Sequence, residues 1–267
     1  MSQQSTPPPG VEAPARIRAA LSARGLCGPL AYVDLDAFDR NAAALLARTG
    51  GKPIRVASKS VRVPALLRRV LDSSRQYQGV LAFSVREAVH LASQHGLDDL
   101  LVAYPTPDAR AVSAAARLVA AGRQITLMVD SEAQLPLLEA AAQAAGTRLA
   151  VCLDLDVSQD YLGLRFGMFR SPLNDVNGVL RLAERIGHSQ WLRLDGLMAY
   201  EGQVAGLADA ARDPRTLAIR ELKRRALPAI AERRASAVAA LERAGHQLRF
   251  VNAGAPAAWK AAPPKPA

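Results

Sequence analysis

The sequence predicts an α/β fold with a parallel sheet, and we favour a (β/α)8 TIM-type barrel. From residue 30 onward, short apolar runs alternate with amphipathic helical stretches. Strands that are apolar on both faces and separated by helices are typical of a parallel sheet covered on both sides. An open doubly wound sheet also fits this order, but no G-x-G-x-x-G motif follows the first strand. Polar residues follow the strand ends, where barrels carry their chemistry.

The expected strands are short runs rich in Val, Ile, Leu and aromatic residues. The first is 30–35, followed by a helix through Arg48. The repeat then begins, with strands at 54–58, 80–84, 100–104, 125–129, 149–155, 194–200 and 248–252. Helices are expected near 62–75, 85–95, 108–121, 131–145, 173–187 and 209–244. Because the repeat supplies only seven strands, the barrel is expected to be truncated before its eighth strand.

The ends of the chain differ in composition from the repeating part. Residues 1–28 read as a flexible N-terminal tail without the basic and apolar regions of a signal peptide, and 255–267 as a disordered Pro/Ala tail. The barrel domain is therefore expected at 29–254. No apolar run approaches the length of a membrane span, and two cysteines make a poor disulfide framework, so a cytoplasmic protein is expected.

The net charge of +10 raises the question of nucleic-acid binding. The basic residues are dispersed except for one cluster between Arg220 and Arg234, where glutamates are interleaved with them. Such a helical segment resembles a solvated face. No stacking aromatic residues accompany it, so neither nucleic acid nor a membrane is expected as a partner.

Lys59 is the most informative single residue. The chain has 34 basic residues, of which only five are lysines, and one of these lies at the end of the run Ile54–Ser58. An amine can lose its proton and attack a carbonyl, whereas a guanidinium cannot be deprotonated in a protein. Lys59 is therefore a candidate Schiff-base residue, although a solvated lysine in a loop is the alternative.

Several motifs, in order, resemble the alanine racemase-like, fold-type III pyridoxal phosphate enzymes. They are Asp34-Leu35-Asp36-Ala37-Phe38-Asp39-Arg40-Asn41, Val56-Ala57-Ser58-Lys59-Ser60, Ala82-Phe83-Ser84-Val85-Arg86-Glu87-Ala88, Leu153-Asp154-Leu155-Asp156-Val157 with Leu164-Arg165-Phe166-Gly167, and Gly196-Leu197-Met198-Ala199-Tyr200-Glu201-Gly202. The last is similar to the D-threonine aldolase, D-serine dehydratase and amino acid deaminase branch. The resemblance covers about residues 30–254.

The resemblance implies a pyridoxal 5'-phosphate enzyme that acts on a small D-amino acid by deamination, retro-aldol cleavage or racemisation. Lys59 would form the internal aldimine and act as an acid/base, with Arg165 and Tyr200 near the cofactor ring or the substrate carboxylate. Arg165 could instead form a structural ion pair with Asp154 or Asp156. Asn252 and Gly254 would help to bind the phosphate through backbone amides, although Pro256 removes one N–H.

Members of this family continue further, into an eighth strand and a C-terminal β-domain that contributes to dimerisation and, in some branches, binds a divalent metal. This chain is expected to lack that domain, and its four histidines are not in ligand spacing. A homodimer is expected only if that domain is supplied. Two alternatives therefore remain beside the enzyme: a non-catalytic pyridoxal phosphate-binding barrel protein, or an inactive fragment of such an enzyme.

Overall fold

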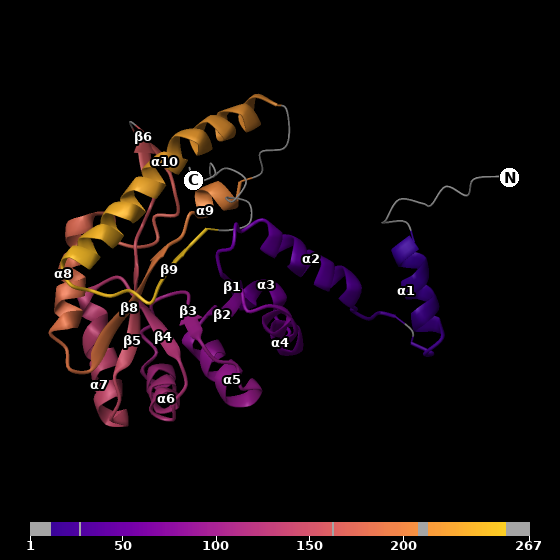
Figure 1. Cartoon of the computed structure of the whole chain (residues 1–267), viewed down its shortest axis with the longest axis horizontal. Coiled ribbons are helices and arrows are strands. Elements are labelled where there is room, and N and C mark those ends of the chain that lie inside the picture. Colours follow the sequence, from indigo (N-terminus) through magenta and orange to yellow (C-terminus); the bar gives the residue numbers. More distant parts are fainter. Residues whose placement is uncertain (1–11, 27, 162, 208–212, 255–267) are drawn as a thin grey trace. The chain divides into compact units, whose positions relative to one another are not determined.

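A computed structural model describes residues 12–26, 28–161, 163–207 and 213–254 of the chain (Figure 1). The chain divides into two compact units, residues 1–47 and residues 48–267, which are described separately below. The expected boundary at residue 28/29 therefore does not coincide with the division between the units. The expected tail at 255–267 lies wholly outside the described residues, and the expected tail at 1–28 lies partly outside them.

The first unit contains two helices, α1 (Glu12–Ser22) and α2 (Leu35–Ala47). Part of the segment expected to be a flexible N-terminal tail thus forms a helix, Glu12–Ser22. The guanidinium of Arg16 in this helix donates to Asp34 at 2.6 Å and to Asp36 at 2.9 Å, which ties α1 to the start of α2. Both contacts lie at the surface, so each contributes little to the free energy of unfolding.

The strand expected at 30–35 does not form. Asp34 instead begins a helix, since its Oδ1 accepts the backbone N–H of Ala37 at 3.1 Å in the manner of an N-cap. Its backbone carbonyl accepts the N–H of Phe38. Residues 30–33 before it form no regular secondary structure, and Tyr32 and Val33 are more than half exposed. A strong capping residue therefore overrides the β propensity of the run.

The second unit is built on a parallel seven-stranded sheet with the order β1-β2-β3-β4-β5-β8-β9. The strands are β1 (Ile54–Ala57), β2 (Tyr77–Ala82), β3 (Leu100–Val102), β4 (Ile125–Val129), β5 (Leu149–Asp154), β8 (Leu192–Ala199) and β9 (Phe250–Ala253). Every strand of the expected repeat is present. An antiparallel hairpin, β6 (Gln159–Tyr161) and β7 (Leu164–Phe166), follows β5 and was not predicted.

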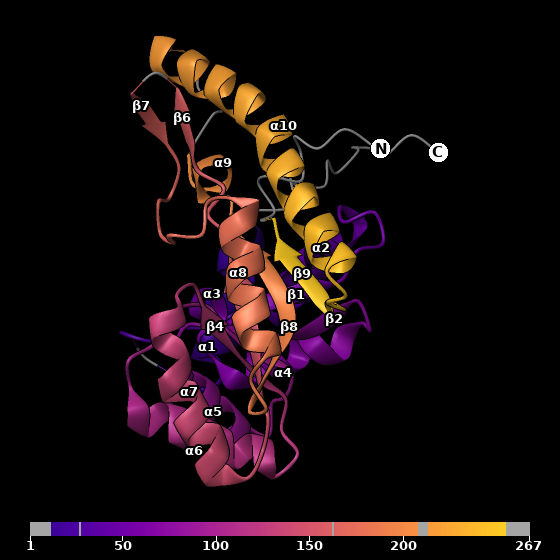
Figure 2. The same ribbon diagram turned by 90° about the vertical axis from the view of Figure 1, so that its left-hand side faces the viewer.

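Helices follow the strands in the expected alternation. They are α3 (Ser58–Val61), α4 (Pro64–Ser73), α5 (Val85–His95), α6 (Ala109–Ala120), the 3-10 turn Glu132–Gln134, α7 (Leu135–Ala145), α8 (Val176–Gly187), α9 (Gly202–Ala205) and α10 (Pro214–Arg243). Neighbouring helices α5, α6 and α7 pack side by side outside the strands, and α8 packs against α10 (Figure 2). No helix within the described residues is both long and apolar enough to cross a membrane.

The sheet curls until its first and last strands face each other. Neighbouring strands lie about 4.8 Å apart, so a flat sheet of this width would separate β1 from β9 by about 29 Å. Here the guanidinium of Arg55 in β1 lies 5.1 Å from the ring centroid of Phe250 in β9. The sheet is therefore a nearly closed barrel, and the predicted barrel with seven strands is confirmed.

An apolar layer fills the barrel interior. It is contributed by six different strands and consists of Leu81, Leu101, Met128, Cys152, Met198 and Phe250. Four of these side chains are at most 3% exposed. Close packing of this layer leaves the ring of Phe250 against Gly196, where a Cβ atom would lie 2.4 Å from the ring. The barrel is thus packed through its middle rather than open as a pore.

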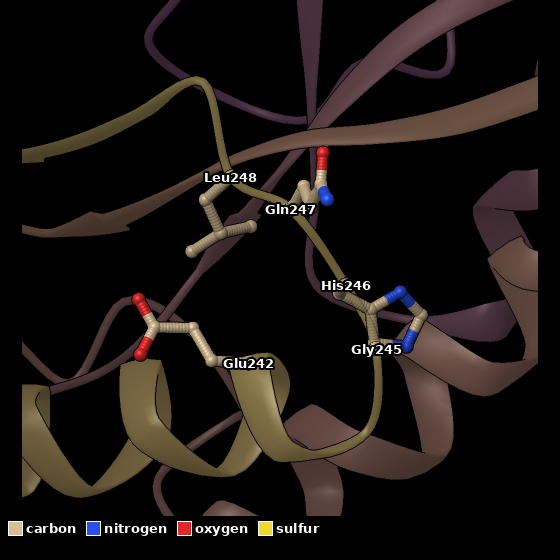
Figure 3. Close-up of a pocket in the computed structure, with 5 residues that line it drawn as sticks. All are labelled: Glu242, Gly245, His246, Gln247 and Leu248. Atoms are coloured by element: carbon tan, nitrogen blue, oxygen red, sulfur yellow. The ribbon is translucent and has the colours of Figure 1, made fainter.

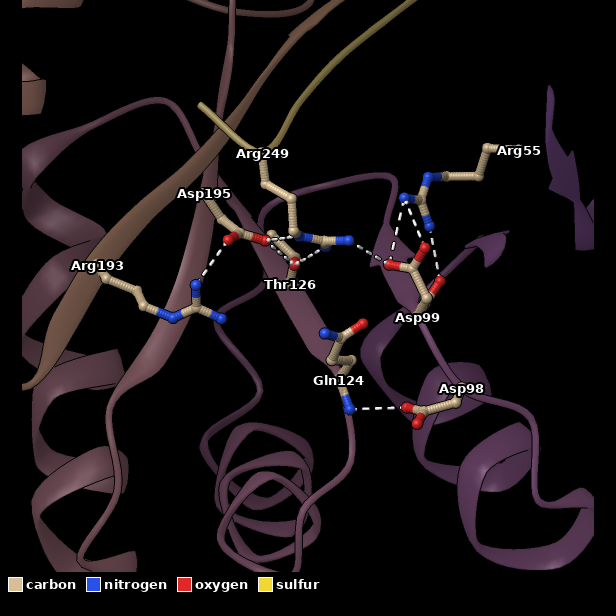
Figure 4. Close-up of polar contacts among 8 residues, drawn as sticks. All are labelled: Arg55, Asp98, Asp99, Gln124, Thr126, Arg193, Asp195 and Arg249. Carbon is tan, nitrogen blue, oxygen red and sulfur yellow. Dashed lines mark hydrogen bonds and ion pairs between the residues drawn. The ribbon is translucent and has the colours of Figure 1, made fainter. Parts of the chain in front are cut away.

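A charged network lies on the N-terminal side of this layer (Figure 4). Arg249 donates from Nε to Asp195 at 2.9 Å and from Nη1 to Asp99 at 2.9 Å, and Thr126 donates to Asp195 at 3.0 Å. Arg55 donates to the carbonyl of Asp99 at 2.6 Å. The network joins β1, β4, β8 and β9, and its place at the N-terminal face of a barrel indicates a role in stability.

The basic cluster of α10 is only partly a solvated face. Arg224 and Arg225 pair with Glu221 at the surface, as expected. Arg233 instead donates to the carbonyl of Ser158 at 2.8 Å, and Arg234 pairs with the buried Glu201 at 3.0 Å. These two arginines bind α10 to the loops that follow β5 and β8. The sequence pattern could not show this, because the acceptors are backbone and side-chain atoms far along the chain.

Candidate functional site

The carboxyl ends of the parallel strands meet at one end of the barrel. Polar and aromatic side chains gather there, namely Ser58 and Lys59 after β1, Phe83 and Ser84 after β2, Tyr104 after β3, Asp130 after β4, Asp154 at the end of β5, Tyr200 and Glu201 after β8, and Asn252 in β9. Barrels place their functional residues at this end. We call it the barrel mouth.

Lys59 lies in the short helix α3, directly after β1, and its side chain is exposed. Its neighbour Ser58 is buried, with Oγ 2.7 Å from Oε2 of Glu87 and 3.2 Å from the carbonyl oxygen of Leu81. Glu87 also accepts the N–H of Phe83 at 2.6 Å. The ends of β1 and β2 are therefore tied together beside Lys59, which fixes the backbone that carries the amine.

Arg170 provides the cation at the centre of the mouth. Its Nε and Nη2 donate to Oδ2 of Asp154 at 2.9 and 2.7 Å, and Nη2 also donates to the carbonyl of Ala103 at 2.7 Å. Its guanidinium carbon lies 4.7 Å from the ring centroid of Tyr104 and 5.5 Å from that of Tyr200. One arginine thus contacts residues from three strand ends.

The loop that carries Arg170 is fastened to the end of β5. The backbone N–H of Arg170 donates to Asp156 at 2.8 Å, and the hydroxyl of Ser171 donates to the carbonyl of Asp154 at 2.6 Å. Gly167 permits the approach, since a Cβ atom there would overlap Ser158 at 2.0 Å. The glycine of the Arg165-Phe166-Gly167 motif is therefore required by packing of the hairpin.

Asp154 is a buried carboxyl group with a raised pKa and one oxygen that accepts no hydrogen bond from the described residues. Burial raises the pKa of Asp154 above its ordinary 3.8, and the nearby positive charge of Arg170 offsets only part of this effect. Its second oxygen, Oδ1, is buried and accepts no hydrogen bond from the described residues. A buried acceptor without a donor costs free energy, so this atom is a candidate to accept a hydrogen bond from a ligand.

The structure brings together only some of the residues that the sequence singled out. Tyr200 lies in the mouth against Arg170, whereas Arg165 lies on β7 with its guanidinium 3.9 Å from the ring centroid of Phe169. The alternative ion pair of Arg165 with Asp154 or Asp156 is also not formed within the described residues: Asp154 pairs with the side chain of Arg170, and Asp156 accepts the backbone N–H groups of Ser158 and Arg170. Arg170 was missed. A buried aspartate at a strand end requires a cation nearby, and that signal could have led to it.

Asn252 and Gly254 lie at the end of β9. Asn252 pairs in register with Met198 of β8, and its amide nitrogen lies 3.1 Å from the sulfur of that residue. Gly254 has a φ of +83°, a conformation that side chains other than glycine adopt rarely. Gly254 thus has a backbone conformation that favours glycine at the point where backbone amides would be needed to hold an anion, and the following residues lie outside the described part.

Two recesses open on the second unit. One, of about 690 Å³, is lined by Asp156, Ser158, Asp160, Arg165, Phe169, Ser171, Asn174 and Arg233, beside the β6–β7 hairpin. The other, of about 340 Å³, lies before β9 at the opposite end of that strand, between Glu242 and Leu248 (Figure 3). The first borders the mouth through Asp156, and it is where Arg165 lies.

No group of three metal-binding side chains gathers within the described residues. His90 and His95 lie beside each other on α5, with ring nitrogens 3.2 Å apart, on the exposed surface. A tetrahedral or octahedral site needs more ligands than this pair supplies.

Residues 33–261 match the alanine racemase N-terminal domain family. The chain belongs to this family. Its enzymes generally use pyridoxal phosphate, and the members related to this chain include D-amino acid aldolases and dehydratases. Among curated proteins, the chain is 27% identical over 235 residues to a 3-hydroxy-D-aspartate aldolase of Paracoccus denitrificans. That match covers 85% of this chain but only 54% of the relative, so the chain spans about half the length of that relative.

Solved structures of family members share the fold. The D-threonine aldolase from Filomicrobium marinum matches with a TM-score of 0.71 and 22% identity, over 88% of this chain and 58% of that chain. The D-threo-3-hydroxyaspartate dehydratase from Delftia sp. HT23 matches with a TM-score of 0.62 and 24% identity, over 89% of this chain and 57% of that chain. At such identities the likeness concerns the barrel alone.

Proposed function

We propose that the barrel mouth binds pyridoxal phosphate through Lys59 and acts on a small D-amino acid. The observation that carries this proposal is the exposed amine of Lys59 directly after β1 in a member of this family. An amine at such a place can hold the cofactor covalently. The bound cofactor would supply an electron sink for bonds at the α-carbon of an amino acid.

The residues of the mouth fit such a group in three respects. Tyr104 and Tyr200 place aromatic rings 4.7 and 5.5 Å from the guanidinium carbon of Arg170. The buried Oδ1 of Asp154 offers an acceptor to a ring N–H, for which no described residue supplies a donor. Gly254 follows β9 directly and lacks a side chain, and we expect the backbone of Asn252 and Gly254 to hold the phosphate.

Proton transfer and substrate positioning would be carried out by side chains of this chain. Lys59 would hold or release a proton at the α-carbon of the substrate, since a neutral amine is a general base. Tyr200 would line the substrate site on the side of β8. The names of the relatives favour retro-aldol cleavage or loss of water from a hydroxylated D-amino acid, with racemisation as the further possibility.

Attachment of the cofactor can be tested without turnover. The purified protein is incubated with pyridoxal phosphate, reduced with borohydride and digested, and the mass added to the peptide containing Lys59 is measured. We expect labelling that Lys59→Ala abolishes and Lys52→Ala, a change at another exposed lysine, leaves intact. Labelling that persists in Lys59→Ala would contradict the assignment.

Turnover is a separate measurement on the same preparation. The loaded protein is given D-serine, D-threonine, 3-hydroxy-D-aspartate or D-alanine, and pyruvate, glycine, glyoxylate and the racemate are assayed. Glycine and an aldehyde from any of the three β-hydroxy amino acids (D-serine, D-threonine or 3-hydroxy-D-aspartate) indicate aldol cleavage, and a keto acid with ammonia indicates loss of water followed by hydrolysis. A labelled protein that converts none of them would be the non-catalytic binding protein.

A further inference from the structure

The geometry points to Arg170, and not Arg165, as the residue that binds the carboxylate of the amino acid substrate. This inference rests on the proposed function, and it names the substrate-binding residue of that site. The two arginines are five positions apart and differ in what they contact. Only Arg170 contacts residues of the strand ends that form the mouth.

The guanidinium of Arg170 is held in one orientation. Asp154 binds the edge formed by Nε and Nη2, and the carbonyl of Ala103 binds Nη2 as well. Tyr104 and Tyr200 lie against the group at 4.7 and 5.5 Å from its central carbon. A planar group fixed along one edge and against two rings loses little further freedom when it binds a ligand.

The remaining nitrogen, Nη1, carries two N–H groups that donate to none of the described residues. The side chain is 15% exposed, so part of the group is open to a ligand. Carboxylates are bound well by guanidinium N–H groups, because both partners are charged. Asp154 neutralises the cation only through one edge, which leaves Nη1 as the free donor at the mouth.

Arg165 lacks these features. It lies on β7 of the hairpin, is exposed, and contacts the ring of Phe169. Its recess also contains the carboxylates of Asp156 and Asp160 and the guanidinium of Arg233. Within the described residues Arg165 makes no contact with Tyr104, Asp154 or Tyr200, so it is poorly placed for the substrate of a site at the strand ends.

The test compares D-alanine with ethylamine, which has the same amine but no carboxylate. Binding of each is measured by calorimetry on wild-type protein, before and after incubation with pyridoxal phosphate. We expect wild-type protein to prefer D-alanine, and Arg170→Gln to lose on the order of 10- to 100-fold of that preference. Arg165→Gln is the matched control and should keep the preference.

Arg170→Gln leaves the buried Asp154 without its cation, so this variant could fold poorly. The double variant Arg170→Gln with Asp154→Asn removes both charges together, and Arg170→Lys keeps the cation without the planar second edge. We expect both to lose the preference while circular dichroism stays that of the wild type. In turnover assays KM should rise more than kcat falls.

The outcomes separate this inference from the proposed function. Wild-type protein that shows no preference for D-alanine overturns the inference, whether or not Lys59 is labelled. A preference that survives in the double variant, or that is lost in Arg165→Gln, overturns it too. Absence of label at Lys59 with an Arg170-dependent preference would overturn the cofactor proposal alone.

Discussion

The ring of Phe250 occupies the space where a side chain at residue 196 would lie. A Cβ atom on Gly196 would come within 2.4 to 2.8 Å of three atoms of that ring. These two residues pair directly between β8 and β9, so neither backbone can move aside without disturbing the register. The glycine of the Gly196-Leu197 motif is therefore a packing requirement of the barrel interior.

We expect Gly196→Ala to lower the free energy of unfolding by about 2 to 3 kcal/mol, as overpacked cores do. Urea denaturation followed by circular dichroism measures the change. Adding Phe250→Leu should recover part of the loss, since the smaller side chain makes room. Gly187→Ala, where the new atom would have an ordinary contact at 3.7 Å, should cost little. Purely additive effects of Gly196→Ala and Phe250→Leu would contradict this account.

Asp195 should be the most sensitive carboxylate of the charged network. Its side chain is 2% exposed and binds Arg193, Arg249 and Thr126. Removing one partner of a buried charge pair typically costs 3–5 kcal/mol, so we expect Asp195→Ala to lose about that amount. Asp98→Ala removes a single exposed contact, to the N–H of Gln124, and should lose about 1 kcal/mol. Similar losses in the two variants would show that the network contributes little.

The stability of the wild type should depend on pH through Asp154. Burial raises the pKa of this carboxyl above 3.8, so the folded state holds its proton more tightly than the unfolded state does. The free energy of unfolding should consequently fall as the pH rises through the folded-state pKa. Asp154→Asn cannot ionise and should lack this fall.

The measurement is the unfolding free energy of both proteins between about pH 4 and about pH 7. The advantage of the wild type over Asp154→Asn should shrink as the pH rises. Asp160→Asn, at an exposed position of the hairpin, serves as the control. An advantage that grows with pH would show that attraction to Arg170 outweighs the cost of burial.

Cys152 should be inert in the folded protein. Burial raises the pKa of this thiol well above its usual value, and the negative charge of Asp154 adds to the effect. Because the thiolate is the reactive form, we expect no reaction with a thiol reagent at mildly alkaline pH. In a Cys27→Ser variant, colour should develop with Ellman's reagent only after urea is added. Rapid native-state reaction would indicate that the barrel interior opens readily.

The parallel repeat could be predicted from the sequence because strands buried on both faces leave a strong apolar signal between helices. The strand expected at 30–35 failed for a local reason, since Asp34 caps a helix whose signal competes with the β propensity of Tyr32 and Val33 before it. The β6–β7 hairpin is only three residues per strand, too short for a periodic pattern to indicate it.

The site was predicted less completely than the fold. Lys59 and Tyr200 could be found because each directly follows a strand that the pattern reveals. For Arg170 the sequence gives only a partial signal: a buried aspartate at the end of β5 requires a cation nearby, but which arginine supplies it depends on how the hairpin folds back and on Phe169, whose φ is +47°. Such backbone geometry is not visible in residue types, particularly at a residue other than glycine.

Among the described strands, β1 pairs only with β2, and β9 only with β8. Arg55 and Phe250 therefore meet across a seam that carries no main-chain ladder. Such a seam can part while the remaining strands stay paired, so hydrogen exchange of backbone amides should be fastest in β1 and β9 and slowest in β4 and β5. Lys59 stands at the end of one of the two strands that border this opening. Lys59, the residue proposed to bind the cofactor, thus lies beside the part of the barrel that we expect to open most readily.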